Sequence, residues 1–295
     1  MEKVVAGSRV GERVGLWGQR VGRFFRFYPL GAFGLVICII MIILGLFGQW
    51  IAPYDPNVVD ADVRLTGPSS SHWFGTDELG RDVMSRIIRG AAVSLRVSFF
   101  AIGIGTCGGY VLGAISGYMG GMFDLLVQRF VDMMMAMPGL LLAMTIVAVL
   151  GPGLPQVIMA LSFSFFFGPV RVSRGVVLSI KENAYVDAGR VIGASQLRML
   201  VRHIIPNAMA PFLIVASTAL GAAVLAEASL SYLGLGVPPP HPSWGRALSG
   251  SAAIYAQVAP WTVISPGVAI MLLVLGFNLF GDALRDIWDP RLRGR

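Results

Sequence analysis

The sequence predicts an all-α polytopic membrane protein with six transmembrane helices. Apolar residues make up 55% of its 295 residues and charged residues only 13%, whereas soluble domains are roughly 25% charged. The mean hydropathy is +0.72. A helix needs about 20 apolar residues to cross the hydrocarbon core of a bilayer, and the runs of about that length are 30–51, 92–117, 125–150, 156–178, 208–235 and 261–281.

The first apolar run, 30–51, follows a basic segment at 1–29. The run begins too late and is too long for the apolar part of a signal peptide, and no small-residue cleavage pattern follows it. We therefore expect a retained first span.

A polar loop at 52–91 follows, and it contains the stretch GTDELGRDVMSR at 75–86. Thr76 is a favourable N-cap, and Asp77 and Glu78 would then lie in the first helical turn, where the helix dipole favours acids. We therefore expect a short interfacial helix that begins here. It is either a simple connection or a lid or docking surface for an external partner.

The second span, 92–117, has a glycine at every fourth position in its C-terminal half: Gly105, Gly109, Gly113 and Gly117. Glycines at this spacing share one helix face and let another helix approach closely. The face is either a subunit interface or moving seam, or ordinary packing within one chain.

The third and fourth spans are less regular. Pro138 is expected to kink the third span. Asp132 in the same span has Arg129 three residues before it, which predicts a local helical ion pair near the cytoplasmic interface. The fourth span, 156–178, becomes polar early, within FFFGPVRVSRGVV.

The fifth span, 208–235, contains Glu227. An acid inside a span is a candidate functional group: it could line a path, carry a proton, or hold helices together through hydrogen bonds. We favour the structural role, because an acid without a basic partner in the membrane makes a poor proton relay. The next loop, 236–260, opens with VPPPHPSWG, which predicts a stiff, extended outer connection.

No metal or disulfide site is expected. Cys38 and Cys107 both lie in apolar runs and are expected to be buried. The three histidines are far apart in the sequence and fit no metal-ligand spacing.

Basic residues set the orientation. They gather before the first span, after the fourth span and in the tail, whereas the 52–91 loop balances its four arginines with six acids. The positive-inside rule therefore places both termini in the cytoplasm. The expected organisation is a cytoplasmic segment (1–29), a first helix (30–51), an extracytoplasmic loop (52–91), a five-helix core (92–284) with a cytoplasmic loop (179–207), and a cytoplasmic tail (285–295).

The cytoplasmic loop contains YVDAGRVIGASQLRMLVRHIIPN, residues 185–207. Its second half has the apolar spacing of an amphipathic helix over 197–205, and a shorter apolar stripe precedes it. Gly193 separates the halves, Ser195 can cap the second helix, and Pro206 can end it. We expect a helix–turn–helix knuckle rather than a loop packed on its own bundle.

These residues resemble the EAA motif of ABC importer permeases, which reads Glu-Ala-Ala, three residues, Gly, nine residues, then Ile-x-Leu-Pro. Asp187 begins the Glu-Ala-Ala positions, Gly193 stands at the glycine, and Pro206 at the proline. Asp187 replaces Glu, Gly189 replaces the second Ala, and His203 stands where Ile is usual. Gly189 should loosen the first helix, by up to about 1 kcal/mol relative to Ala.

Other stretches are similar to the dipeptide, oligopeptide and nickel permeases, and to the second, C-type permease of the pair. They are HWFGTDELGRDVMSR, EASLSYLGLGVPPPHPSWG and FNLFGDALRDIWDPRLRG. The resemblance runs from about residue 30 to residue 293 and implies the type I ABC importer permease fold of the bacterial inner membrane.

The resemblance also implies a mechanism and a set of partners. A paired homologous permease would enclose the path, two ABC ATPase subunits would each receive one knuckle, and an extracytoplasmic solute-binding protein would deliver substrate. The residues carried over to the ATPase-coupling loop are Tyr185, Asp187, Ala188, Gly189, Arg190, Gly193, Ala194, Ser195, Arg198 and Pro206.

The chain itself is expected to be no enzyme and to hold no cofactor. Its only lysines, Lys3 and Lys181, do not follow a glycine, so it has no P-loop, and ATP and magnesium would be bound by the partner subunits. The alternative is a self-contained, ion-coupled secondary transporter, although no internal repeat is visible. The substrate stays open among dipeptides, oligopeptides, glutathione, nickel chelates and haem.

Overall fold

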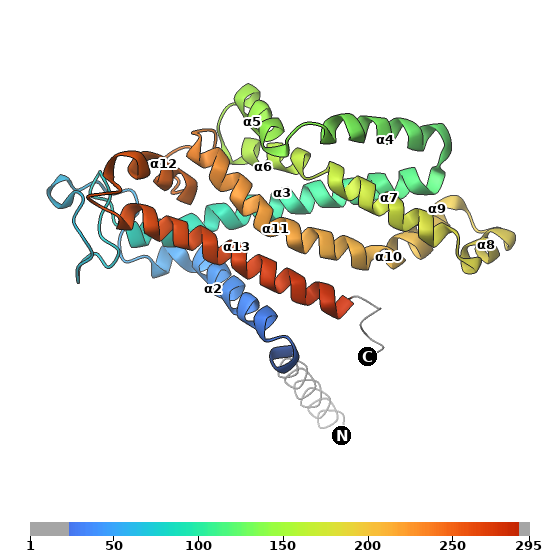
Figure 1. The fold of residues 1–295 in the computed structure, drawn as a ribbon, viewed down its shortest axis with the longest axis horizontal. Coiled ribbons are helices and arrows are strands. Elements are labelled where there is room, and N and C mark those ends of the chain that lie inside the picture. The colour runs from blue at the N-terminus through green and yellow to red at the C-terminus, as the bar shows by residue number, and fades with distance from the viewer. Residues whose placement is uncertain (1–23, 289–295) are drawn as a thin grey trace, which may run out of the picture.

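A computed structural model describes residues 24–288 (Figure 1). Most of the predicted segment 1–29 and the tail beyond residue 288 lie outside the described residues. Five helices are long and apolar enough to cross a membrane, and a bent pair forms a sixth candidate. The prediction of an all-α, six-span protein is therefore confirmed.

The centre of the fold is α3 (Val83–Met119), which packs against α2 (Pro29–Ile51), α11 (Met209–Tyr232) and the fourth span. α13 (Trp261–Trp288) packs against α2 and α11. In Figure 1 α3 runs along most of the length of the molecule.

The third predicted span is broken rather than kinked. α4 (Gly121–Met135) and α5 (Gly139–Leu150) meet at an angle of 87°. Pro138 lies between them as the residue before α5, where its missing N–H and fixed φ end the preceding helix. The fourth span has a shorter interruption at 165–166, between α6 (Leu154–Ser164) and α7 (Phe167–Lys181).

The four glycines of α3 pack within the chain. A Cβ added at Gly105, Gly109 or Gly113 would lie 2.1–2.4 Å from a backbone carbonyl oxygen of the fourth span. Gly117 approaches the Arg174 carbonyl in the same row, at 3.0 Å. The glycines thus form a closely packed seam between α3 and the α6–α7 span. Of the alternatives stated for this helix face, the structure shows packing within one chain.

The end of the fold opposite the 184–207 segment, which the sequence predicts to be the outer end, differs from two expectations. No helix begins at Thr76; residues 75–82 form a loop closed by a bridge between Thr76 and Asp82, and α3 begins only at Val83. Asp82 is the actual cap, since its carboxylate accepts from the Ser85 N–H at 2.8 Å. The second expectation was an extended connection at 236–260. The chain is extended only as far as Ser243 and then forms α12 (Trp244–Tyr255).

Candidate functional site

The 179–207 loop, which the sequence predicts to be cytoplasmic, folds as the expected knuckle, residues 184–207. It consists of α8 (Ala184–Val191), α9 (Gln196–Met199), a π-helical turn at Leu200–Ile204 and α10 (Ile205–Asn207). In Figure 1 α8 and α9 lie at one extreme end of the molecule, far from α12. The predicted Ser195 cap is confirmed, because its hydroxyl accepts from the Arg198 N–H at 3.4 Å.

The turn between the two arms has a defined hydrogen-bond pattern. The Gly193 N–H donates to the Arg190 carbonyl and the Ala194 N–H to the Gly189 carbonyl, both at 3.0 Å. This is the Schellman pattern, which needs a residue with positive φ. Gly193 supplies it with φ of +80°, and a Cβ there would meet no neighbour. The glycine is required by the backbone conformation and not by crowding.

One face of the knuckle is buried on its own bundle. Val186, Met199 and Ile204 are almost fully buried, in one cluster with residues of α3, α7 and α11. Gly189 belongs to this contact, since a Cβ there would lie 2.7 Å from the Met199 sulfur. The glycine that departs from the motif therefore makes room for Met199 between the arms.

The opposite face leaves large apolar side chains exposed. Val191 and Ile192 have 87% and 84% of their surface exposed, and Leu197 has 71%. Polar groups stand beside them, including the Asp187–Arg190 ion pair at 3.0 Å. Exposed apolar residues gathered on a protruding tip, with charges at the edge, are typical of a protein-binding surface.

Pro206 lies in the first turn of α10 and not at a helix end. The chain passes from the π turn through α10 into α11 with only Ala208 between them. The Tyr110 hydroxyl of α3 donates to the Ile205 carbonyl at 2.7 Å, and its ring contacts the Phe212 ring with the centroids 4.5 Å apart and the planes tilted by 40°. The base of the knuckle is thus fixed to α3 by a side chain from the bundle.

Glu227 is fully buried and accepts hydrogen bonds from three serines. Its carboxylate accepts from Ser94 of α3 at 2.9 Å, Ser231 of α11 at 2.8 Å and Ser243 before α12 at 3.2 Å. This geometry joins three elements at the outer end of the bundle. These hydrogen bonds fit the structural role that we favoured for Glu227, which is to hold helices together.

Asp132 is not paired with Arg129 as the sequence suggested. It forms an ion pair with Arg171 of α7, and both side chains are about half exposed. A second acid of α4, Asp124, is held by Arg174 through a bidentate contact at 2.6–3.0 Å. Both pairs join α4 to α7. The ion-pair partners are therefore determined by how the two helices pack, and the residue spacing along α4 alone does not predict them.

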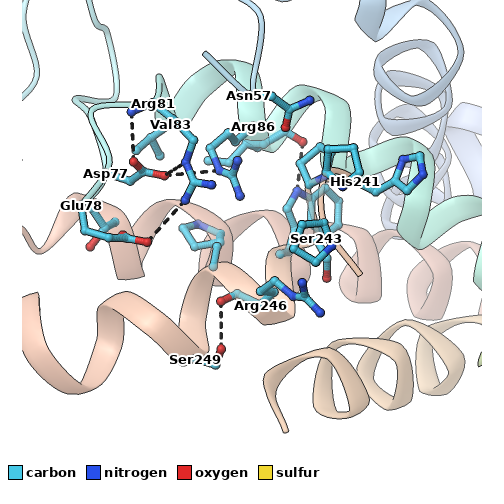
Figure 2. Close-up of a pocket in the computed structure, with 18 residues that line it drawn as sticks. Asn57, Asp77, Glu78, Arg81, Val83, Arg86, His241, Ser243, Arg246 and Ser249 are labelled. Atoms are coloured by element: carbon cyan, nitrogen blue, oxygen red, sulfur yellow. Dashed lines mark hydrogen bonds and ion pairs between the residues drawn. The ribbon is translucent and has the colours of Figure 1, made fainter. Parts of the chain in front are cut away.

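An outer pocket that the sequence did not predict has a volume of about 320 Å³ (Figure 2). The Asp77 carboxylate lies between Arg81 at 2.7 Å and Arg86 at 3.5 Å. Arg246 of α12 enters from the other side and has no acidic partner among residues 24–288. Since Ser243 also lines the pocket, this wall is connected to Glu227.

The described residues contain no group of three or more His, Cys, Asp or Glu side chains that could hold a metal ion. The knuckle helices α8 and α9 and the helix α12, which lines the pocket, lie at opposite ends of the fold (Figure 1).

Comparison with known proteins identifies this arrangement. The family described as "Binding-protein-dependent transport system inner membrane component" matches residues 109–294, and the "N-terminal TM domain of oligopeptide transport permease C" matches residues 15–68. The dipeptide transport system permease protein DppC of Alkalihalophilus pseudofirmus is 42% identical over 266 residues, covering 90% of this chain and 86% of the relative. The glutathione transport system permease protein GsiD of Escherichia coli O6:K15:H31 is 41% identical over 273 residues, covering 92% and 90%. With a knuckle between its fourth and fifth spans and matches along nearly its whole length, the chain belongs to the family of binding-protein-dependent transport system inner membrane components and is a permease subunit of an ABC importer.

Proposed function

We propose that this permease subunit imports short peptides, such as dipeptides or glutathione, together with a paired homologous permease. The relatives named above are a dipeptide permease and a glutathione permease. An extracytoplasmic binding protein delivers the solute, and two ATPase subunits bind ATP and magnesium and hydrolyse the nucleotide. The chain itself is no ATPase.

The observation that carries this proposal is the exposed apolar tip of the knuckle, formed by Val191, Ile192 and Leu197. Such side chains are stabilised when they leave water for a groove on a partner, and a few residues near the centre of an interface carry most of its affinity. The tip protrudes away from the bundle, where a cytoplasmic ATPase has access to it (Figure 1).

The inner face of the same knuckle supports a lever mechanism. Val186, Met199 and Ile204 pack on α3, α7 and α11. The Schellman turn holds the two arms at a fixed angle, so a displacement of the tip is passed to these spans. ATP-driven closure of the two ATPases thereby changes which side of the membrane the path faces.

The distribution of charge supports an orientation with both termini in the cytoplasm of a bacterial inner membrane. Lys181, Arg190, Arg198 and Arg202 lie at or near the knuckle. The opposite end holds Asp77, Glu78 and Asp82 beside its arginines. By the positive-inside rule the knuckle end is cytoplasmic.

The test is the substitution Ile192→Asp in the assembled importer. A charge at the centre of a buried interface should weaken ATPase binding by 2 kcal/mol or more, which is about 30-fold. The permease should still insert, because Ile192 makes no buried contact in its own chain. The readouts are co-purification of the ATPase subunits and ATP-driven uptake in proteoliposomes.

The matched control is Val258→Asp, at an apolar residue near the outer end that has 69% of its surface exposed. It should leave ATPase binding unchanged. Normal ATPase recovery with Ile192→Asp, or uptake by the permease pair in vesicles that contain no ATPase, would overturn the proposal.

A further inference from the structure

A second cavity, of about 490 Å³, lies where the two interrupted spans meet. Its wall includes Met134 and Met137 at the α4–α5 break and Phe165 and Phe167 at the α6–α7 break. The Ser164 hydroxyl donates to the Gly139 carbonyl at 3.0 Å and joins the two breaks. Interrupted helices at membrane depth occur where they line a cavity or are buried in protein, and such a site can hold a solute.

The cavity lies well inside the spans. Asp132 is 11 residues after Gly121, the start of α4, which corresponds to about 16 Å along a helix. Arg171 is 10 residues before Lys181, the end of α7, or about 15 Å. Both charged residues therefore lie several turns inside the helices of the third and fourth spans, and not at their ends.

The charges at this depth are exposed. Arg171, which lines the cavity, and its ion-pair partner Asp132 have 53% and 44% of their side-chain surface exposed. Charged groups inside a membrane face a water-filled path or the protein interior and not lipid tails. The exposed residues of α2 as far as Phe47, including Ile40, are by contrast apolar.

We propose that this cavity is a solute station on the path, where a short peptide with free termini binds in transit. This proposal rests on the proposed function. Arg171 takes the peptide carboxylate through its planar, two-donor guanidinium. Asp132 takes the peptide ammonium. In the empty state the two side chains pair with each other, so neither charge is left alone at membrane depth.

The remaining wall suits side chains of different shape. Met134, Met135 and Met137 are flexible and polarizable, and Phe165 and Phe167 provide flat apolar surfaces. Methionine-rich walls adapt to varied apolar ligands. The station therefore fixes the peptide ends and tolerates the side chains between them.

The first experiment measures accessibility. Of the two native cysteines Cys38 is buried, as expected, whereas Cys107 is exposed against expectation. Both are replaced by alanine, and Val172→Cys in the cavity is compared with Ile40→Cys on α2, in the full importer with and without trapped nucleotide. A charged, membrane-impermeant maleimide should label position 172 in at least one state and position 40 in neither.

Dialanine and glutathione serve as probes, and excess probe should slow labelling at position 172. Absence of labelling at position 172 in every state would show that lipid or the paired permease covers the cavity, and would overturn the proposal. Labelling that neither probe slows would also overturn it, as would a wild-type importer that transports neither probe.

The second experiment separates binding from structure. Arg171→Gln should raise KM for uptake of the transported probe about tenfold while the affinity of the isolated binding protein is unchanged. Exchanging the charges, as Asp132→Arg with Arg171→Asp, keeps an ion pair between α4 and α7 but reverses its direction. The exchanged variant should insert normally and retain the high KM. Full recovery of uptake by the exchange would assign the pair a purely structural role.

Failure of this proposal can be distinguished from failure of the proposed function. An importer can retain ATPase binding and ATP-driven uptake, with the expected Ile192→Asp defect, and still show no solute station. If Ile192→Asp caused no defect, the coupling role of the knuckle would be wrong. The labelling at position 172 would still test the solute station by itself.

Discussion

The two ends of the molecule are built in opposite ways. At the end that holds α12, Asp82, Glu227 and the Trp244 indole all find hydrogen-bond partners inside the chain. At the other end, the knuckle buries one face on the bundle and leaves Val191 and Ile192 exposed. At the first end the buried polar groups are satisfied within the chain, whereas the knuckle leaves large apolar side chains exposed at its tip.

This difference separates stability from coupling. Substitutions at the outer end or in the α3 seam should lower the stability of the subunit. Substitutions on the knuckle tip should leave the subunit folded and affect its association. The predictions below break or sharpen this contrast, and they run from the largest expected effect to the smallest.

A substitution in the seam between α3 and the α6–α7 span should cause the largest loss of stability. In Gly109→Val, the new Cβ would lie 2.1 Å from the Phe166 carbonyl oxygen, which is backbone and cannot turn away. We expect a loss of about 3 kcal/mol from overpacking, seen as a lower midpoint of thermal unfolding in detergent. Gly103→Val is the control, because a Cβ at Gly103 meets nothing. Equal midpoints for the two variants would contradict the seam.

The buried acid should come next. Glu227→Ala removes the acceptor of three serine hydroxyls at once, and each unsatisfied buried polar group costs about 1–3 kcal/mol. We expect a loss of about 2–3 kcal/mol, measured in the same thermal assay. Glu227→Gln keeps an oxygen acceptor at this place and should recover most of the stability. If the two variants proved equally stable but both stopped transport, Glu227 would be a path residue instead.

The cap of α3 should have a smaller effect. Asp82→Ala removes the bonds to the Ser85 N–H at 2.8 Å and to His72 Nδ1 at 3.0 Å. Loss of an N-cap costs about 0.5–2 kcal/mol. The matched control is Asp55→Ala, an exposed acid that accepts only from the Asn57 N–H two residues on. Its thermal midpoint should stay close to that of the wild type.

The sequence predicted well what depends on local pattern. Run length located the spans, and the spacing around Gly193 located the knuckle and its Ser195 cap. At Thr76 the local pattern misled, because the same stretch offers a second cap six residues later, and Asp82 is selected by its bonds to Ser85 and His72. Which cap is used depends on how the 52–82 loop folds back.

Contacts between distant segments were beyond the sequence. Asp132 has a near neighbour in Arg129, yet it pairs with Arg171, 39 residues away. The glycine row of α3 was visible, but its partner, the fourth span, was not. The outer pocket joins 77–87 to 239–249, and a helix within the predicted extended loop supplies part of its wall. Each of these needs the relative placement of helices.

The smallest expected change in stability tests the knuckle itself. Gly193→Ala puts a Cβ into open space but keeps a left-handed conformation, which costs an L-residue about 1–2 kcal/mol. This cost falls on a protruding segment, so the thermal midpoint of the bundle should hardly move. The angle between the arms should become less well defined, and ATPase activity should respond less to loaded binding protein. Gly193→Asn, a residue that tolerates this conformation, should lose less coupling than Gly193→Ala. The reverse order would show that the turn does not transmit the movement, and that the exposed tip acts only as an anchor.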